Sequence, residues 1–295
     1  MPEAPQSPPD RPLQVVRTRA ELAAARDALP GPVAVVMTMG ALHAGHAELI
    51  ARARERGGSV LVTVFLNPLQ FGAGEDLARY PRTLDDDIAL AAAHGADVVF
   101  APAPDVVYPD GDPGVRVSAG PLGEVLEGAS RPGHLDGVLT VVAKMFHLTR
   151  ADVAFFGQKD AQQLLLVRRM VRDLDLGVEV VAVPTVREAD GLAMSSRNRY
   201  LTPFDREVAL VLGRALDAGR EAAVEGPSAV RRAARDVLRA EPAARVDYLA
   251  LVDPVGLADV PEHFRGEALL AVAARVGSTR LIDNVPLAVG RDRPA

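Results

Sequence analysis

Short apolar runs alternate with amphipathic stretches along the first two thirds of the chain. These runs lack strict polar alternation, which is typical of strands buried on both faces of a sheet. Helical patterns separate them, which implies a parallel sheet with right-handed crossovers and helices on both faces. We therefore predict a Rossmann-like α/β domain. Its predicted strands are residues 33–37, 59–66, 98–101, 153–156 and 178–183.

Local signals mark several of the predicted helix ends. Thr18 and Glu21 have the spacing of a capping box and should open the first helix. Asp136 is expected to cap a helix over 137–150, after an irregular segment rich in Pro and Gly at 102–136. The other helices of this part are expected to end near residues 30, 56, 95 and 174.

The pattern changes after about residue 186. Amphipathic helices are predicted over 204–224 and 228–240, followed by strands over 246–252, 267–275 and 279–284. Because helices and strands no longer alternate, this part is expected to be a smaller α+β domain. The predicted division is a disordered Pro-rich extension at 1–12, a nucleotide-binding domain at 13–186 and a lid-like domain at 187–290.

Composition excludes several classes of protein. The 295 residues include no cysteine, so a disulfide framework, a thiolate nucleophile and Cys-ligated zinc are impossible. A net charge of −6 argues against a general nucleic-acid or membrane-surface binder. No secretory leader and no apolar run long enough to span a membrane is visible, so we expect a cytoplasmic protein. The 33 basic residues include only two lysines, Lys144 and Lys159.

The first candidate for chemistry is the segment at 37–46, between a predicted strand and a predicted helix. Ligands of open parallel sheets bind at such helix N-termini. Small residues there let a phosphate approach the backbone, and His43 and His46 can donate N–H groups to phosphate oxygens. Two surface histidines, or a metal-binding pair, are the alternatives. The spacing is not that of a P-loop.

A second candidate, at 157–160, follows the fourth predicted strand and should lie at the same sheet edge. The flexible ammonium of Lys159 suits a phosphate that changes shape during a reaction. A solvated lysine is the alternative, although a helix N-terminus disfavours a cation. Lys144 lies within an amphipathic helical pattern and is predicted to be structural.

Two polar loops follow other predicted strands. The loop at 194–198 offers two hydroxyls and a guanidinium that could wrap a phosphate tail, although such tripeptides are common on surfaces. Asn67 and Gln70 could recognise hydroxyls or a carboxylate without adding charge, although turn formation alone would explain them. Asp86 and Asp87 begin a helix, where the dipole favours acidic residues; outer-sphere Mg²⁺ binding is the functional alternative.

Four segments carry a family resemblance. A strand followed by HAGH, with a Lys- and Ser-containing loop later, resembles the HIGH/KMSKS nucleotidyltransferase superfamily. TMGALHAGH, FLNPLQFGAGEDLARYPRT, FFGQKDAQQ and VREADGLAMSSRNRYL, in this order and spacing, resemble the pantoate–β-alanine ligase (pantothenate synthetase) family over about residues 13–290. The resemblance implies that pantoate attacks the α-phosphate of ATP, giving pantoyl adenylate and pyrophosphate. β-Alanine then attacks the adenylate, releasing AMP and pantothenate. It also implies Mg²⁺ and a homodimer.

The resemblance further implies roles for individual residues. His43, His46 and Lys159 would act on the phosphates, and Asp160 would lie near the ribose. The residues implied for pantoate and β-alanine are Asn67, Gln70 and Gln163. The residues implied for ATP are Met39, Gly40, Ala41, Leu42, His43, Ala44, Gly45, His46, Gly157, Gln158, Lys159, Asp160, Val186, Met194, Ser195, Ser196 and Arg197. Loops at 67–82 and 110–136 are candidate covers for the adenylate.

Three positions depart from the family pattern: Met37, Gln158 and Leu90. Met37 stands where many relatives have Pro, Gln158 removes a charge beside Lys159, and Leu90 weakens the metal prediction. The alternatives are another nucleotidyltransferase, a fragment of a class I aminoacyl-tRNA synthetase, and a non-enzymatic nucleotide-binding module. Because the substrates are mostly anions and the chain is acidic, we expect positive charge to be concentrated locally, on His43, His46, Lys159 and Arg197.

Overall fold

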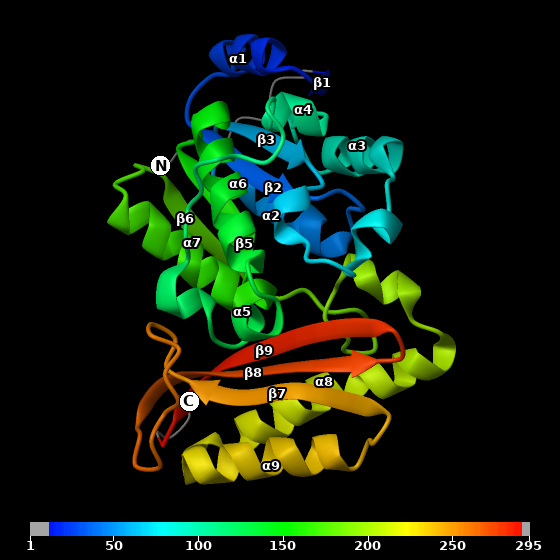
Figure 1. Ribbon diagram of the computed structural model, residues 1–295, viewed down its shortest axis with the longest axis vertical. Helices are drawn as coiled ribbons and strands as arrows, with labels where there is room; N and C mark the ends of the chain where they lie inside the picture. The colour runs from blue at the N-terminus through cyan, green and yellow to red at the C-terminus, as the bar shows by residue number, and fades with distance from the viewer. Residues whose placement is uncertain (1–11, 291–295) are drawn as a thin grey trace, which may run out of the picture.

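A computed structural model describes residues 12–290, which form two sheets (Figure 1). The first sheet has six parallel strands in the order β1-β4-β3-β2-β5-β6, which confirms the predicted Rossmann-like α/β architecture. Its strands are β1 (Gln14–Val16), β2 (Val33–Thr38), β3 (Ser59–Val64), β4 (Val98–Phe100), β5 (Val153–Gly157) and β6 (Glu179–Val183).

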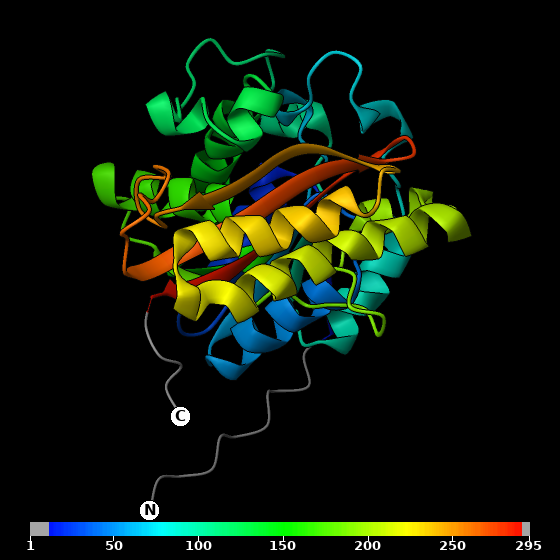
Figure 2. The ribbon, with the colours of Figure 1, turned by 90° about the horizontal axis from the view of Figure 1, so that it is seen from below.

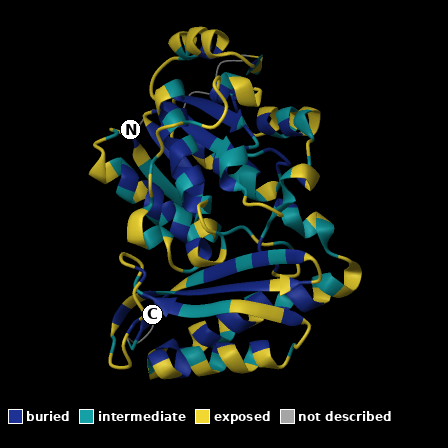
Figure 3. Ribbon diagram, in the orientation of Figure 1, coloured by how far each residue is buried: buried dark blue, intermediate teal, exposed yellow. Residues whose placement is uncertain are grey.

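The strands of this sheet are largely buried between helices that cover both faces (Figure 3). Alternate residues of each strand enter opposite cores. On β2, Val33 and Val35 pack with the helices of one face, and Ala34 and Val36 pack with those of the other. This explains the continuous apolar runs. The first face carries α1 (Arg19–Ala28), α6 (His134–Thr149) and α7 (Ala161–Asp173). The second carries α2 (Ala44–Glu55) and α3 (Leu84–Ala93).

The strand order creates a crevice at the carboxyl ends of β2 and β5. From β2 the chain winds outward through β3 and β4, whereas β5 and β6 extend the sheet in the other direction. In open α/β sheets, ligands bind outside the carboxyl ends of strands at such a reversal. The segments that follow β3, β2, β5 and β6 are the four sequence motifs, so the topology gathers them at one edge.

The second sheet is antiparallel and has α8 (Pro203–Glu221) and α9 (Pro227–Arg239) on one face (Figure 2). Its core includes residues from Leu192 onward, separate from the cores of the parallel sheet. Its other face is directed toward the parallel sheet (Figure 1). The smaller α+β part is confirmed; the boundary between 186 and 187 stays a prediction. The strands are β7 (Ala244–Val252), β8 (Gly266–Val276) and β9 (Thr279–Val289).

Some local predictions were wrong. Strand β1 was missed because three residues, Gln14–Val16, give too short a periodic pattern. Helix α6 begins at His134, three residues before the predicted start. Gly133, with φ 80°, is its N-cap, and Asp136 lies in its first turn, where the carboxylate accepts from the Ala119 amide at 2.7 Å. The predicted irregular segment at 102–136 contains the short helices α4 (Pro104–Val107) and α5 (Glu127–Ser130).

The sequence also predicted a disordered N-terminal extension and no membrane-spanning helix. The predicted extension at 1–12 lies outside the described residues except for Pro12. Among residues 12–290, no helix is both long enough and apolar enough to cross a membrane.

Candidate active site

Two adjoining cavities lie at the crevice. The smaller, of about 240 Å³, is lined by residues of all four motifs. The larger, of about 800 Å³, continues beneath the antiparallel sheet. Lys159, Gln163 and Arg197 line both cavities, so the two adjoin at these residues. The predicted site residues that line the smaller cavity are Met39, His43, Gly45, His46, Asn67, Gln70, Gly157, Lys159, Asp160, Gln163, Val186, Met194, Ser195, Ser196 and Arg197.

The two histidine rings lie against each other, tilted by 38°, at the N-terminus of α2. His43 is the N-cap, and its Nδ1 accepts from the Gly45 amide at 3.1 Å. The Nδ1 of His46 accepts from the His43 amide at 3.3 Å, and the two ring centroids are 4.1 Å apart. A Cβ at Gly45 would lie 2.9 Å from the His43 ring, so a larger residue would displace the ring from its capping position. The small residue in HAGH therefore allows the cap as well as close approach of a ligand.

These hydrogen bonds fix the protonation of both rings. An Nδ1 that accepts from an amide carries no proton, so the neutral ring is protonated at Nε2 and can donate there. Burial, with Lys159 and Arg199 nearby, lowers the pKa of His43 to about 4. Burial, with His43 and Lys159 nearby, lowers the pKa of His46 to about 3. The predicted concentration of charge on the histidines is therefore corrected: they are neutral donors at neutral pH.

Imidazole NMR resonances test this protonation directly. We expect the signals of His43 and His46 to stay those of the neutral Nε2–H tautomer from pH 8 down to about 5, because both pKa values lie well below the ordinary histidine pKa of about 6.5. Between pH 8 and pH 5 these two histidines bind protons in the unfolded chain but stay neutral in the folded protein. Acidification over this range should therefore also lower the free energy of unfolding. Titration of either ring near pH 6.5 would contradict this assignment.

Lys159 lies in the turn between β5 and α7. Its side chain is 19% exposed, and its Nζ is 3.9 Å from Oδ1 of Asp160, outside hydrogen-bond distance. The Asn284 side chain, from β9, donates to the carbonyls of Gln158 and Lys159 at 3.1 and 2.8 Å. The antiparallel sheet therefore anchors the backbone of the turn, while the ammonium, which has only a long ion pair with Asp160, lines both cavities.

Arg197 is already paired. Its guanidinium donates two hydrogen bonds of 2.9 Å to Asp76, and it lies over the Tyr80 ring. Tyr80 in turn hydrogen-bonds Ser196 at 2.9 Å, so the loop at 67–82 contacts the loop at 194–198 directly. The expected positive charge of Arg197 is thus offset by Asp76, and Lys159 is left as the least compensated cation among the predicted site residues.

Asn67 and Gln70 both line the smaller cavity; Asn67 is the N-cap of the turn η1 (Pro68–Gln70), and Gln70 is its last residue. Asn67 Nδ2 donates to Gln70 Oε1 at 3.0 Å and to the Gly137 carbonyl at 3.1 Å. Tyr108 donates to Asn67 Oδ1 at 2.9 Å. Both amides are buried, so these contacts fix which of their atoms can reach a ligand.

The chain matches the family model described as pantoate-beta-alanine ligase over residues 14–286. The chain belongs to this family. It is 56% identical to a protein named pantothenate synthetase from Streptomyces avermitilis, over 88% of this chain and 94% of that one. It is 59% identical to one of the same name from Thermobifida fusca, over 92% and 95%.

Solved structures agree with the family assignment. A pantothenate synthetase from Thermus thermophilus superposes with a TM-score of 0.87 at 52% identity, covering 92% of this chain and 98% of that one. A pantoate-beta-alanine ligase from Francisella tularensis, complexed with beta-gamma ATP and beta-alanine, superposes with a TM-score of 0.75 at 31% identity. It covers 93% of this chain and 97% of that one.

Asp87, one of the two predicted metal ligands, has a different set of partners in this family member. Its buried carboxylate accepts from the amides of Ala41 and Leu42 at 3.0 and 2.8 Å, and from Thr83 at 3.1 Å. Asp86 is exposed on α3. Within residues 12–290, no group of three or more His, Cys, Asp or Glu side chains could hold a metal. The pair therefore does not fit a resident metal centre.

Asp87→Asn should weaken ATP binding and lower stability. The carboxamide offers one acceptor oxygen where the turn at Ala41 and Leu42 needs two, so an amide hydrogen would face the new NH₂ group. We expect the KM for ATP to rise about tenfold and the free energy of unfolding to fall by about 1–3 kcal/mol. Steady-state kinetics and denaturant unfolding measure both. Asp86→Asn is the matched control; a raised Mg²⁺ requirement in that variant would instead support a metal role.

Not every predicted ATP residue lines the cavity. Ala41 and Leu42 are buried in the turn itself, where their amides bind Asp87, and Ala44 is exposed to solvent. The carbonyl of Gln158 is bound by Asn284. Lys144, predicted to be structural, lies on α6 with its Nζ 5.3 Å from the centre of the Tyr108 ring. It lines neither cavity.

Sequence reasoning missed several residues of the cavities: Glu75, Tyr80, Arg131, His134 and Arg280. Arg131 and His134 stand in a Pro-Gly segment directly before an apolar helix, which is the one signal that could have drawn attention to them. Arg280 could not have been found, because its partner Glu127 is 153 residues away.

Proposed function

We propose that the joined cavities are the active site in which this chain condenses pantoate with β-alanine, using ATP. The observation that carries the proposal is the meeting of His43, His46 and Lys159 with Asn67 and Gln70 in one cavity. Neutral N–H donors and one cation suit a triphosphate, and buried amides suit a small hydroxy acid. Membership of the pantoate-beta-alanine ligase family supports the same proposed reaction.

In the first step, pantoate would attack the α-phosphate of ATP. A carboxylate is ionised at neutral pH, so this step needs no general base. The residues then act by orientation and by stabilising charge. The Nε2–H groups of His43 and His46 would donate to phosphate oxygens, and Lys159 would follow the charge that develops on the leaving pyrophosphate. Gln70 and Gln163 would hold pantoate. The products of this step are pantoyl adenylate and pyrophosphate.

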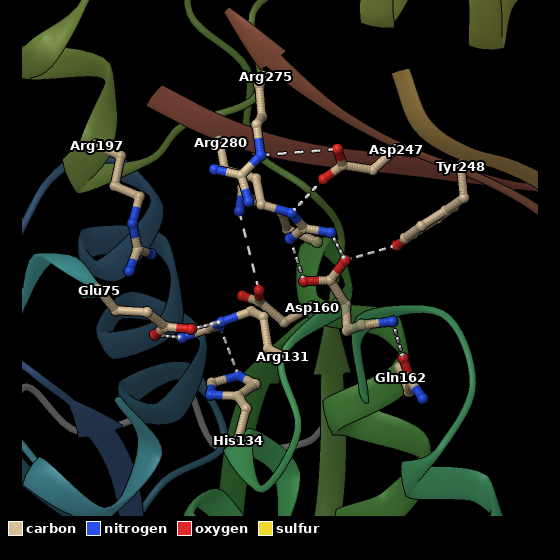
Figure 4. Close-up of polar contacts among 12 residues, drawn as sticks. Glu75, Arg131, His134, Asp160, Gln162, Arg197, Asp247, Tyr248, Arg275 and Arg280 are labelled. Atoms are coloured by element: carbon tan, nitrogen blue, oxygen red, sulfur yellow. Dashed lines mark hydrogen bonds and ion pairs between the residues drawn. The ribbon is translucent and has the colours of Figure 1, made fainter. Parts of the chain in front are cut away.

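In the second step, the β-alanine amine would attack the acyl carbon and release AMP. The adenylate must be kept from water until then. The antiparallel sheet is well placed to do so, because Arg280 and Tyr248, which line the larger cavity, connect it to α5 (Figure 4). Arg280 donates to both oxygens of Glu127 at 2.7 and 2.8 Å, and Tyr248 donates at 2.8 Å. Burial alone would raise the pKa of Glu127, but the hydrogen bonds from Arg280 lower it.

The proposal also covers the metal ion, the oligomeric state and the cellular location. Mg²⁺ is taken to enter with ATP, bound to its phosphate oxygens, and so to belong to the substrate rather than to a protein site. The protein is proposed to act as a homodimer in the cytoplasm. It is proposed to need no nucleic acid or membrane as a partner, in keeping with its net charge of −6.

Omitting each substrate in turn tests the proposal. With pantoate, β-alanine and MgATP all present, pantothenate, AMP and pyrophosphate should appear in equal amounts. AMP release at the full rate should need both pantoate and β-alanine. Formation of ADP, or turnover indifferent to pantoate, would favour a different ATP-using enzyme. Tight binding of ATP without turnover would favour a nucleotide-binding module.

A further inference from the structure

The backbone of Gln70 is held as firmly as its side chain. Its carbonyl oxygen accepts two hydrogen bonds, from Nδ1 of His134 at 2.8 Å and from a guanidinium nitrogen of Arg131 at 3.2 Å. Its side chain is fixed by Asn67 and by a 3.0 Å contact from Nε2 to Sδ of Met39. A short 3-10 turn has few internal hydrogen bonds, so these outside contacts determine where the Gln70 amide points.

Arg131 cannot easily leave this arrangement. Two of its guanidinium nitrogens donate to the carboxylate of Glu75, at 2.8 and 2.5 Å, and a third lies 2.9 Å from Nε2 of His134 (Figure 4). Side-chain exposure of Arg131 and Glu75 is only 15% and 24%, so the pair is shielded from competing water. The guanidinium is therefore a fixed donor to both His134 and Gln70.

The proton on His134 follows from these partners. Arg131 can only donate, so Nε2 of His134 must accept, and Nδ1 must carry the hydrogen that is donated to the Gln70 carbonyl. This is the opposite tautomer from that of His43 and His46. Burial and the neighbouring Arg131 lower the pKa of His134 to about 4, in agreement with a neutral ring.

Helix α6 brings His134 to this turn. The left-handed φ of 80° at Gly133 starts the helix at His134, with its first turn against the backbone of η1. At Gly137, one helical turn later, a Cβ would lie 2.2 Å from the Leu69 carbonyl oxygen, so glycine is required for this approach. The carbonyl of Gly137 also accepts from Asn67. The start of α6 thus contacts η1 at two points.

We propose that His134 is a positioning residue for pantoate, acting through the Gln70 carbonyl to orient the Gln70 amide. His134 is itself fixed by Arg131, which Glu75 holds. The inference rests on the proposed role of Gln70 as a pantoate ligand, and it adds a residue that supports that ligand from behind. It predicts an effect on pantoate binding that disappears when the Gln70 side chain is absent.

The test is a double-mutant cycle read in the KM for pantoate. His134→Ala removes one of the two donors to the carbonyl and should raise that KM about tenfold, the equivalent of one hydrogen bond. The KM for ATP should change by less than about twofold. In a Gln70→Ala background, His134→Ala should add little, because the side chain that it positions is gone. His134→Asn, whose Nδ2 can donate where Nδ1 did, should restore most of the affinity.

A matched control lies on the same helix. His147 is exposed on α6, and its Nδ1 contacts a backbone carbonyl, that of Ala143, at 2.7 Å. His147→Ala should leave the KM for pantoate unchanged. Thermal unfolding of each variant separates loss of folding from loss of positioning, and the Asn variant keeps the test informative if His134→Ala does not fold.

Two outcomes would overturn the inference in distinguishable ways. If Gln70→Ala alone leaves the KM for pantoate unchanged, Gln70 is not a pantoate ligand, and the positioning role falls with it. If Gln70→Ala raises that KM but the two substitutions are additive, or His134→Asn is no better than His134→Ala, then His134 does not act through Gln70. If the unaltered protein forms no pantothenate from pantoate, β-alanine and ATP, the proposed function itself is refuted.

Discussion

Lys159→Ala is expected to slow formation of the acyl adenylate by about 10²–10³-fold. The Lys159 ammonium lies at the junction of the two cavities, and Asp160 is 3.9 Å away, too far for a hydrogen bond. It is therefore available to a phosphate whose charge grows as pyrophosphate leaves. Because an interaction made mainly in the transition state alters the rate more than binding, kcat should fall far more than the KM for ATP rises.

Rapid-quench measurement of pyrophosphate release in a single turnover gives this rate directly. Lys144→Ala is the matched control, since Lys144 is the other lysine of the chain and lines neither cavity. We expect its rate to stay within about twofold of the unaltered protein, as for an ordinary surface substitution. An unchanged rate in folded Lys159→Ala would show that Lys159 has no part in the chemistry.

His46→Ala is expected to slow pyrophosphate release by about 10²-fold, because one N–H donor to a developing charge is removed. The KM for pantoate should rise less, since the residues proposed to hold pantoate, Gln70 and Gln163, remain in place. His46 also has a structural contact, because its Nδ1 accepts from the His43 amide at 3.3 Å. The alanine variant removes both contacts, so it cannot by itself separate catalysis from capping.

Two amide variants separate the two contacts of His46. His46→Asn keeps an oxygen near the position of Nδ1, able to accept from the His43 amide, but has no donor at the position of Nε2. His46→Gln places an NH₂ group near Nε2. If donation matters, Asn should remain about as slow as Ala, and Gln should recover part of the rate. Recovery in Asn and not in Gln would mean that His46 acts only as a helix cap.

Local pattern predicted most of the fold. The alternation of buried runs with helical patterns gave five of the six parallel strands, and with them the crossovers that bring the motifs to one edge. β1 was not predictable, since Gln14–Val16 gains its stability from pairing with β4 rather than from its own sequence. The start of α6 was misplaced because Asp136 resembles an N-cap, whereas its carboxylate binds the Ala119 amide.

The sequence predicted which residues form the candidate site, but not which partners compensate their charges. Family motifs named fifteen of the residues that line the smaller cavity. Their electrostatics depend on partners distant in the chain. Asp76 offsets Arg197 across 121 residues, and Asp87 holds the amide of Ala41 across 46. Such contacts produce no periodic pattern in a sequence, so it could not show that the expected metal ligand Asp87 and the expected cation Arg197 have other partners in the folded protein.

Exchange of labelled pyrophosphate into ATP tests the central claim most directly, because it reports the first step alone. With pantoate and MgATP present and β-alanine absent, reversal of adenylate formation should move label from pyrophosphate into ATP. Leaving out pantoate should abolish the exchange, and Lys159→Ala should reduce it by about 10²–10³-fold. Exchange that proceeds without pantoate, or that requires β-alanine, would contradict a pantoyl-adenylate mechanism at this site.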